Sequence, residues 1–217
     1  MKQLLYKEFR LASHPAAILF LALSTMMLIP NYPLTVTFFY PCLGAFFICL
    51  NSRENRDLAY TLLLPVKKRD LVRARVLMVA VLQLCQLLLC VPFFFLRALY
   101  PPVGNVLGLD ANLALLGFGL VEFGIFNLIF FSWHYRDPAK VGVPFLVGSI
   151  AVFVWVGISE AAAHILPFVR DRLDTPLFAF LPEKAAALLI GAVLYVLLTG
   201  LAVRIAERRF EQLDVQM

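Results

Sequence analysis

Long apolar runs separated by short polar segments dominate this chain of 217 residues. Six runs reach or approach the roughly 17–25 residues that a helix needs to cross a bilayer. They cover about residues 15–30, 34–50, 71–96, 112–133, 143–166 and 183–203. The first two runs are near the short limit, so they form either a complete hairpin or one that requires local thinning of the bilayer. The pattern predicts an all-α, polytopic membrane protein with a single transmembrane domain, residues 1–217, and six transmembrane helices.

The composition agrees with a chain whose solvent is largely lipid. Hydrophobic residues make up 62% of the chain and charged residues 15%, against about 45–50% and 25% in soluble domains. The four cysteines form no CxxC pair and fall in or beside apolar runs, where they act as small buried hydrophobes. No basic stripe with interleaved aromatic residues lies outside the runs, which argues against nucleic acid as a partner.

Positive charge alternates with the apolar runs and predicts an orientation. Fifteen of the 19 lysine and arginine residues fall in residues 1–15, 51–75, 134–142 and 203–217. The intervening connections contain only Arg97, Arg170, Arg172 and Lys184. Connections rich in Lys and Arg stay in the cytosol. We therefore expect both termini in the cytoplasm, with most of the net charge of +5 in cytoplasmic segments near anionic lipid head groups.

Residues 1–14 precede the first run and are amphipathic. Leu4, Leu5 and Phe9 fall on one side of a helix over residues 2–13, and most of the basic side chains fall elsewhere. This pattern predicts an interfacial helix that lies on the inner leaflet. Ser13 and Pro15 then suit the N-cap and the first turn of the first span.

The segment 51–70 is the longest connection expected in the cytoplasm. Asn51-Ser52-Arg53-Glu54 resembles a capping box, in which a polar cap and a following acid satisfy the first N–H groups of a helix. We expect a short helix over residues 53–63, charged at its start and apolar at its end, which Pro65 terminates. Such a helix is either a rigid handle for a partner or a juxtamembrane helix that the basic run 67–69 holds on lipid.

Four of the polar side chains within the apolar runs are candidates for a functional role: Gln83, Gln86, Glu122 and Asn127. A carboxylate near the middle of a span is costly in lipid, so Glu122 should face protein or water. It is either part of a substrate or proton site in a cavity, or a hydrogen-bonded structural carboxyl at a helix contact. Gln83 and Gln86 lie three residues apart and share a helix face, which is either a packing seam or the wall of a pathway.

Motifs for covalent chemistry are missing from the sequence. It contains no HExxH, no GxSxG and no pair of histidines at metal-ligand spacing. Glu160 and His164 lie four residues apart, but two ligands make no metal site, and we interpret them as a local pair. We therefore predict no catalytic residue and no metal site. The P-loop pattern GxxxxGK[ST] is also missing, so any ATP that powers this protein must bind to another polypeptide.

The sequence from Glu54 to Arg75 resembles the cytoplasmic segment of bacterial type-2 ABC transporter permeases. In those proteins a helix that carries an acid leads into Leu-Pro-Val, one or more basic residues, an acid, and a third span that starts with Arg or Lys. The matching residues here are Glu54, Leu64, Pro65, Arg69, Asp70 and Arg75. The interfacial N-terminal helix and the six spans also fit this family, so the topology is similar over the whole chain.

The resemblance implies that segment 51–70 contains a coupling helix, which docks in a groove of a separate ATP-binding cassette subunit. We expect Glu54 and Asp57 to pair with a basic groove of that subunit, while Leu58 and Leu62 fill an apolar pocket. The partner subunit would bind ATP and Mg²⁺, and this chain would need no cofactor of its own. A second permease, either an identical copy or a related chain, would complete the transporter.

The resulting prediction is the permease subunit of an ATP-driven exporter in a bacterial cytoplasmic membrane, without enzymatic activity of its own. Small six-span permeases with little mass outside the bilayer resemble exporters of peptides, such as bacteriocins or phenol-soluble modulins, or of other amphipathic or hydrophobic substrates. Two alternatives stay open: a proton-coupled secondary transporter that uses Glu122, and a non-transporting membrane partner protein. Inverted repeats and broken helices would favour the secondary transporter, and the sequence shows neither.

Overall fold

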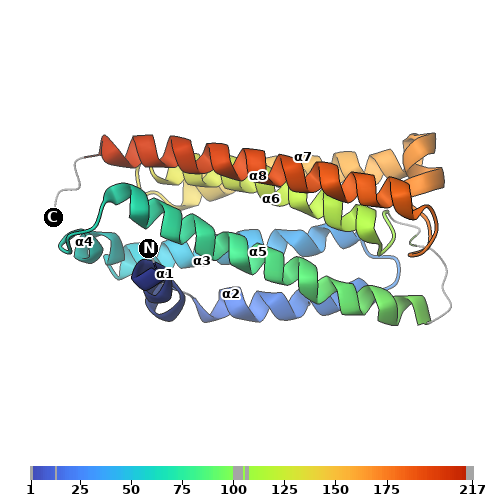
Figure 1. The fold of residues 1–217 in the computed structure, drawn as a ribbon, viewed down its shortest axis with the longest axis horizontal. Coiled ribbons are helices and arrows are strands. Elements are labelled where there is room, and N and C mark those ends of the chain that lie inside the picture. The colour runs from blue at the N-terminus through green and yellow to red at the C-terminus, as the bar shows by residue number, and fades with distance from the viewer. Residues whose placement is uncertain (1, 13, 100–104, 106–107, 214–217) are drawn as a thin grey trace.

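The protein is a bundle of long helices that run side by side, seen here in a computed structural model (Figure 1). The structure describes residues 2–12, 14–99, 105 and 108–213, and this part of the chain contains no strand. Five helical segments are long and apolar enough to cross a membrane: Leu34–Glu54, Lys68–Leu99, Leu113–His134, Gly142–Ile165 and Leu181–Glu211. The prediction of an all-α, polytopic membrane protein is confirmed.

These five segments contain the main helices of the bundle. The first of them joins a 3₁₀ segment, η3 (Leu34–Phe38), to α3 (Phe39–Glu54). The others are α5 (Lys68–Leu99), α6 (Leu113–His134), α7 (Gly142–Ile165) and α8 (Leu181–Glu211). Two short elements connect them: α4 (Asp57–Leu62) and a π-helical turn, η4 (Val169–Leu173).

A sixth candidate span lies in the N-terminal region and is bent. Its first arm contains α1 (Lys2–Lys7) and the π-helical turn η1 (Glu8–Ala12), and its second contains α2 (Pro15–Leu19) and the 3₁₀ segment η2 (Phe20–Leu28). The two arms meet at 90°, as an interfacial helix followed by a crossing helix requires. The 3₁₀ rise extends the second arm to about 26 Å, close to the roughly 30 Å of a hydrocarbon core.

The junction between these arms differs in detail from the prediction. His14, and not Ser13, precedes α2 as its N-cap, and His14 Nδ1 accepts a hydrogen bond from the Ala16 N–H at 3.1 Å. Pro15 occupies the first turn, where its missing N–H costs nothing. The predicted cap Ser13 lies outside the described residues.

The bundle has two distinct ends, which we call the termini end and the far end. The termini end carries α1, α4 and the last turns of α8, and the far end carries the turn after η2 and the loop that contains η4 (Figure 1). At the far end, the Arg97 guanidinium donates to the carbonyls of Met27 and Ile29, at 2.8 and 3.1 Å. This contact fastens α5 to the end of η2.

α6 is the central helix, and most of its side chains are buried. It packs most closely against α8, where Gly117 on α6 faces Gly191 and Ala187 on α8. A Cβ atom on Gly117 would lie 2.6 Å from the Ala187 carbonyl oxygen, so only glycine permits this approach of the two backbones. Close packing through small residues is how helices associate in lipid.

The outward faces of α5, α7 and α8 are apolar. Their exposed side chains include Leu77, Leu84 and Leu88 on α5, Leu146, Ile150 and Val154 on α7, and Leu189, Val193 and Leu197 on α8. A soluble protein rarely exposes an apolar surface of this extent. These faces are suited to lipid, and the protein is a multi-pass membrane protein.

The predicted capping box at residues 51–54 is wrong. These residues form the last turn of α3, and the Asn55 N–H donates to the Asn51 carbonyl at 3.0 Å. The chain reverses at Arg56, which adopts the left-handed conformation with φ of 48°. The short helix therefore begins at Asp57 and not at residue 53. The capping pattern does not start a new helix here, because α3 continues through residues 51–54.

Candidate functional site

α4 turns one face towards the bundle and the other away from it. Leu58 and Leu62 are partly buried and pack against the hydrophobic core. Tyr60 on α4 is 67% exposed, and Leu63 and Leu64, which directly follow α4, are 64% and 58% exposed. We call these three residues the exposed α4 face. The expected anchors Leu58 and Leu62 thus face inward, and apolar side chains beside them are the accessible ones.

The two acidic residues expected to contact the partner, Glu54 and Asp57, have different environments. Glu54 is exposed on the last turn of α3 and forms an ion pair with Arg53. Asp57 is turned inward at the start of α4, and its carboxylate is occupied by partners within the chain. Glu54 therefore remains accessible to another protein, and Asp57 serves as an internal link.

Asp57 belongs to a group of four charged residues that we call the Arg75 cluster: Lys7, Glu8, Asp57 and Arg75. Arg75 lies one to two turns inside α5 and is 1% exposed, and Glu8 is 0% exposed. The Arg75 guanidinium forms an ion pair with Glu8 through Nε and donates from Nη2 to Asp57 Oδ2 at 2.8 Å. Two positive and two negative charges make the cluster neutral.

Lys7 closes the Arg75 cluster on the side of the N-terminal arm. Its Nζ lies 2.5 Å from Asp57 Oδ1 and 3.2 Å from Glu8 Oε1. It also donates to the Thr61 hydroxyl at 2.9 Å, one turn further along α4. The cluster therefore joins the N-terminal arm, which is distant in sequence, to α4 and α5.

Because the Arg75 cluster is buried, its ion pairs affect both the pKa of Asp57 and the stability of the fold. Burial alone would raise the pKa of Asp57, but the hydrogen bond from Lys7 and the charge of Arg75 outweigh it, and the pKa lies below its usual value. Removing one member of a buried ion pair leaves an uncompensated charge, which costs about 3–5 kcal/mol. The cluster is therefore a stiff connection between α4 and α5.

A second set of ion pairs connects the start of α5 to the end of α8. Arg69 Nε lies 2.5 Å from Glu211 Oε1, and Arg73 Nε lies 2.5 Å from Glu207 Oε1. Lys68 Nζ donates to the Leu213 carbonyl at 2.7 Å. Together with the Arg75 cluster, these contacts connect α4 to α8 through the first turns of α5.

The polar side chains predicted for the interior all lie inside the bundle. Gln83 on α5 and Asn127 on α6 exchange two side-chain hydrogen bonds, each 2.9 Å long. On α8, the Tyr195 hydroxyl donates to Gln83 Oε1 at 3.0 Å, and Thr199 Oγ1 accepts from Asn127 Nδ2 at 3.1 Å. This network joins three spans near the middle of the bundle.

Glu122 and Gln86 are also 0% exposed, but they have a different environment. Neither side chain has a hydrogen-bond partner among the described residues. Glu122 lies near the Cys42 thiol on α3, close enough to interact with it electrostatically. Buried polar groups without partners are uncommon, and in a membrane protein an ionisable one indicates a functional position.

Glu160, one of the two side chains of the Glu160–His164 pair, is held by hydrogen bonds within the chain. The Glu160 carboxylate accepts hydrogen bonds from the Thr35 hydroxyl and from the Leu109 N–H. Among the described residues, no three His, Cys, Asp or Glu side chains are grouped as a metal ion would require. Glu160 fastens the far-end loop to α7 instead.

Sequence reasoning missed three members of the Arg75 cluster, although a signal was present. Glu8 is four residues after Leu4 and three after Leu5, so it lies on the apolar side of the N-terminal helix. Arg75 lies two turns into α5, where the sequence becomes apolar. An acid and a base on opposing apolar faces predict a buried pair, because neither charge is tolerated alone.

A family model described as ABC-2 family transporter protein matches residues 3–207. The match includes every element from α1 to most of α8, and therefore the Arg75 cluster, α4 and the interior network. Comparison with curated proteins and with solved structures gave no match.

Proposed function

The chain belongs to the ABC-2 transporter family, and on that basis we propose that it is the permease subunit of an ATP-driven exporter in a bacterial cytoplasmic membrane. The observation that carries this proposal is the placement of α4. Its inner side is tied to α5 through Asp57 and Arg75, while the exposed α4 face is accessible to a partner. A coupling helix needs both properties, a free surface and a stiff connection to the spans.

The partner in this proposal is an ATP-binding cassette subunit, which binds ATP and Mg²⁺. An apolar groove of about 340 Å³ lies between α1 and α4, next to the exposed α4 face. Tyr60 and Leu64 form part of its lining. Large apolar and aromatic side chains contribute most of the energy of interfaces, and exposed charges such as Glu54 contribute less. We therefore place the docking contacts on Tyr60, Leu63 and Leu64.

The proposed mechanism transmits motion from α4 to the bundle. Closure of two ATP-binding subunits displaces α4, and the Arg75 cluster moves α5 with it. The ion pairs of Arg69 and Arg73 then carry the displacement to α8, which packs on α6 beside the interior network. A second permease copy supplies the other half of the pathway. ATP shifts access across the membrane only through its different affinity for the two states.

The substrate class in this proposal is a peptide or another amphipathic molecule. The described part of the chain has little mass outside the bundle, so the substrate would reach the protein from the cytoplasm or the inner leaflet. Gln83, Gln86, Glu122 and Asn127 supply polar contacts in an interior that is otherwise apolar and aromatic. The positive charges favour a cytoplasmic position for the termini end, and export as the direction rests on the resemblance to small exporter permeases.

Co-purification tests the docking surface. We expect Leu63→Asp to release the ATP-binding subunit, recognised by its P-loop, from the detergent-extracted complex and to abolish export. Leu166→Asp is the matched control, because Leu166 is 50% exposed at the far end. Both variants should reach the membrane, since neither residue lies within a crossing helix.

Retention of a full complement of ATPase and normal export in Leu63→Asp would refute the assignment of α4. Loss of the ATPase in Leu166→Asp as well would mean that any charge at an exposed leucine disturbs the complex, and would equally contradict the specific role of α4.

A further inference from the structure

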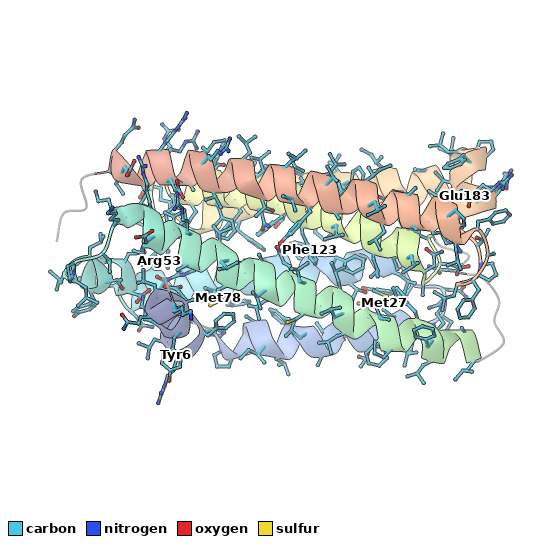
Figure 2. The ribbon with its side chains drawn as sticks, in the orientation of Figure 1. Tyr6, Met27, Arg53, Met78, Phe123 and Glu183 are labelled. Atoms are coloured by element: carbon cyan, nitrogen blue, oxygen red, sulfur yellow. The ribbon has the colours of Figure 1, made fainter. Side chains whose placement is uncertain are left out.

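A pocket of about 370 Å³ lies between the first turns of α5 and the last turns of α8, at the termini end. Its lining consists of Arg69, Arg73, Arg204, Glu207 and Arg208. Four guanidinium groups and one carboxylate give it a strong net positive charge. Nitrogen atoms gather above this part of α8 in the stick view (Figure 2).

The arginines of this pocket differ in their partners. Arg69 and Arg73 pair with Glu211 and Glu207. The guanidinium groups of Arg204 and Arg208, one turn apart on α8, have no hydrogen bond or ion pair within the described part of the chain. Both side chains are exposed. The pocket therefore has unused donors for an anion, in the planar geometry that suits phosphate oxygens.

An apolar strip leads from the pocket towards the middle of the bundle on both helices. Leu77 on α5 lies one turn beyond Arg73, and Leu201 and Leu197 on α8 lie one and two turns before Arg204. All three leucines are exposed, by 44%, 46% and 62%. Charge at the end of a span and exposed leucine along it match the two parts of a phospholipid, its head group and its acyl chains.

We propose that this pocket binds the phosphate head group of an anionic phospholipid, with the acyl chains along Leu77, Leu197 and Leu201. Arg204 and Arg208 provide the direct contacts, and Arg69 and Arg73 add positive charge from α5. Arg204 directly follows the apolar run of α8, which places its guanidinium at the level of the lipid head groups. A lipid in this seam would bridge the same two helices that the ion pairs of Arg69 and Arg73 connect.

Lipid binding to the detergent-purified full chain tests this proposal, with native mass spectrometry as the readout. We expect phosphatidylglycerol to bind in preference to phosphatidylcholine. Arg204→Ala/Arg208→Ala should weaken phosphatidylglycerol binding by roughly 30-fold, since each basic residue at an anionic membrane surface contributes about fivefold. Lys2→Ala/Lys140→Ala, which removes two exposed charges at the same end but outside the pocket, should change it less than about twofold.

Glu207→Gln provides a test with the opposite sign. It removes the negative charge from the pocket and should tighten phosphatidylglycerol binding, whereas a purely structural role of the pocket predicts weaker binding in every variant. Glycerol phosphate distinguishes a lipid site from a phosphate site: binding of the soluble head group as tight as that of the lipid would overturn the acyl-chain part of the proposal.

Equal binding of the two lipids by the wild type would overturn the proposal. So would a double arginine variant that keeps its lipid preference but loses the ATP-binding subunit, because the arginines would then form a protein-docking surface.

Discussion

Arg75 Nη2 donates to Asp57 Oδ2 at 2.8 Å, and this contact joins the third apolar run to the short helix that precedes it. The two residues are only 18 positions apart, but the chain between them leaves the bundle, forms α4 and returns. Because Glu8 and Lys7 complete the set, the N-terminal arm is fixed by the same contacts. The orientation of α4 therefore depends on charges that lie within the bundle, beneath its exposed face.

A charge-balance experiment tests this dependence. Arg75→Gln leaves Glu8 and Asp57 opposed only by Lys7 and should lower stability by about 3–5 kcal/mol. Arg75→Gln/Glu8→Gln restores neutrality, so we expect it to be more stable than the single variant. The measurement is thermal unfolding of the purified protein. Arg53→Gln is the control, because the Arg53–Glu54 pair is exposed and such pairs contribute at most about 1 kcal/mol.

The cluster would lose its assigned role if the double variant were less stable than Arg75→Gln, since additive losses indicate independent contacts and not one balanced group.

The sequence predicted the spans because apolar length is a strong signal, but that signal does not show how far the helices continue beyond the apolar runs. α5 begins at Lys68 and α8 continues to Glu211, beyond the predicted limits of 71 and 203, because charged residues continue a helix outside the hydrocarbon. The conformation of Arg56 could not be predicted from the sequence either. A left-handed arginine has no local sequence signature, yet it decides where α4 begins and which of its faces is exposed.

The sequence identified the interior polar residues but not their hydrogen-bond partners. Four polar side chains in apolar runs stand out in the sequence, and all four are buried. That Gln83 and Asn127 pair with each other, while Gln86 and Glu122 have no partner, depends on the rotation of α5 and α6 about their axes. That rotation is set by contacts such as Gly117 with Gly191, between residues 74 positions apart, and no local pattern contains it.

The α6–α8 contact leads to a sharp prediction about glycine. We expect Gly191→Val to destabilise the bundle by at least about 1–3 kcal/mol, because a side chain there meets the backbone of Gly117. Gly200→Val on the same helix should be nearly neutral, since a Cβ at Gly200 would have no neighbour within 4 Å. Thermal unfolding and size-exclusion chromatography in detergent measure the stability of both variants. Equal behaviour of the two variants would contradict the packing described here.

Asp174, at the far end, predicts a pH dependence. Burial, with smaller contributions from Asp110 and Glu160, raises the pKa of Asp174 from 3.8 to about 6, although Oδ1 accepts the Asp110 N–H. The folded protein thus holds this proton to a higher pH than the unfolded chain. The contribution of Asp174 to stability is present below about pH 4 and is lost as the pH rises through about 6.

Asp174→Asn should therefore unfold at the same temperature as the wild type near pH 4 and at a higher temperature at pH 7.5. We expect a difference of roughly 2–4 °C, which corresponds to about 1 kcal/mol for a partly solvated group in a chain of this size. Asp171→Asn is the control, because Asp171 is exposed and its pKa is lowered by Arg170. A wild-type advantage at pH 7.5 would show that the charged form of Asp174 is stabilising.

Orientation in the membrane can be measured by cysteine labelling. Lys140 at the termini end and Arg170 at the far end have exposed side chains, 75% and 58%. In a background without Cys85, the one native cysteine that is not fully buried, Arg170→Cys should react with an impermeant maleimide in intact cells. Lys140→Cys should react only after permeabilisation. The reverse pattern would place the termini outside and would contradict the predicted orientation.

Glu122 and Asn127 lie five residues apart on α6, and the structure assigns them opposite responses to substitution. Asn127→Leu removes three side-chain hydrogen bonds. At an average of about 0.6 kcal/mol for each such bond in a membrane protein, we expect a loss of roughly 2 kcal/mol. Glu122→Gln removes no hydrogen bond among the described residues and conserves the shape of the side chain, so its unfolding temperature should match that of the wild type.

Export should depend on Glu122 although stability does not, because we propose that Glu122 lines the pathway. We expect Glu122→Gln to reduce export while the ATP-binding subunit stays bound in full stoichiometry, because the carboxylate lies far along α6 from α4. Glu122→Leu separates charge from packing: a buried carboxyl without a partner is costly, so the leucine variant should be at least as stable as the wild type and equally defective in export. Normal export by a stable Glu122→Leu protein would show that this carboxyl has no part in transport.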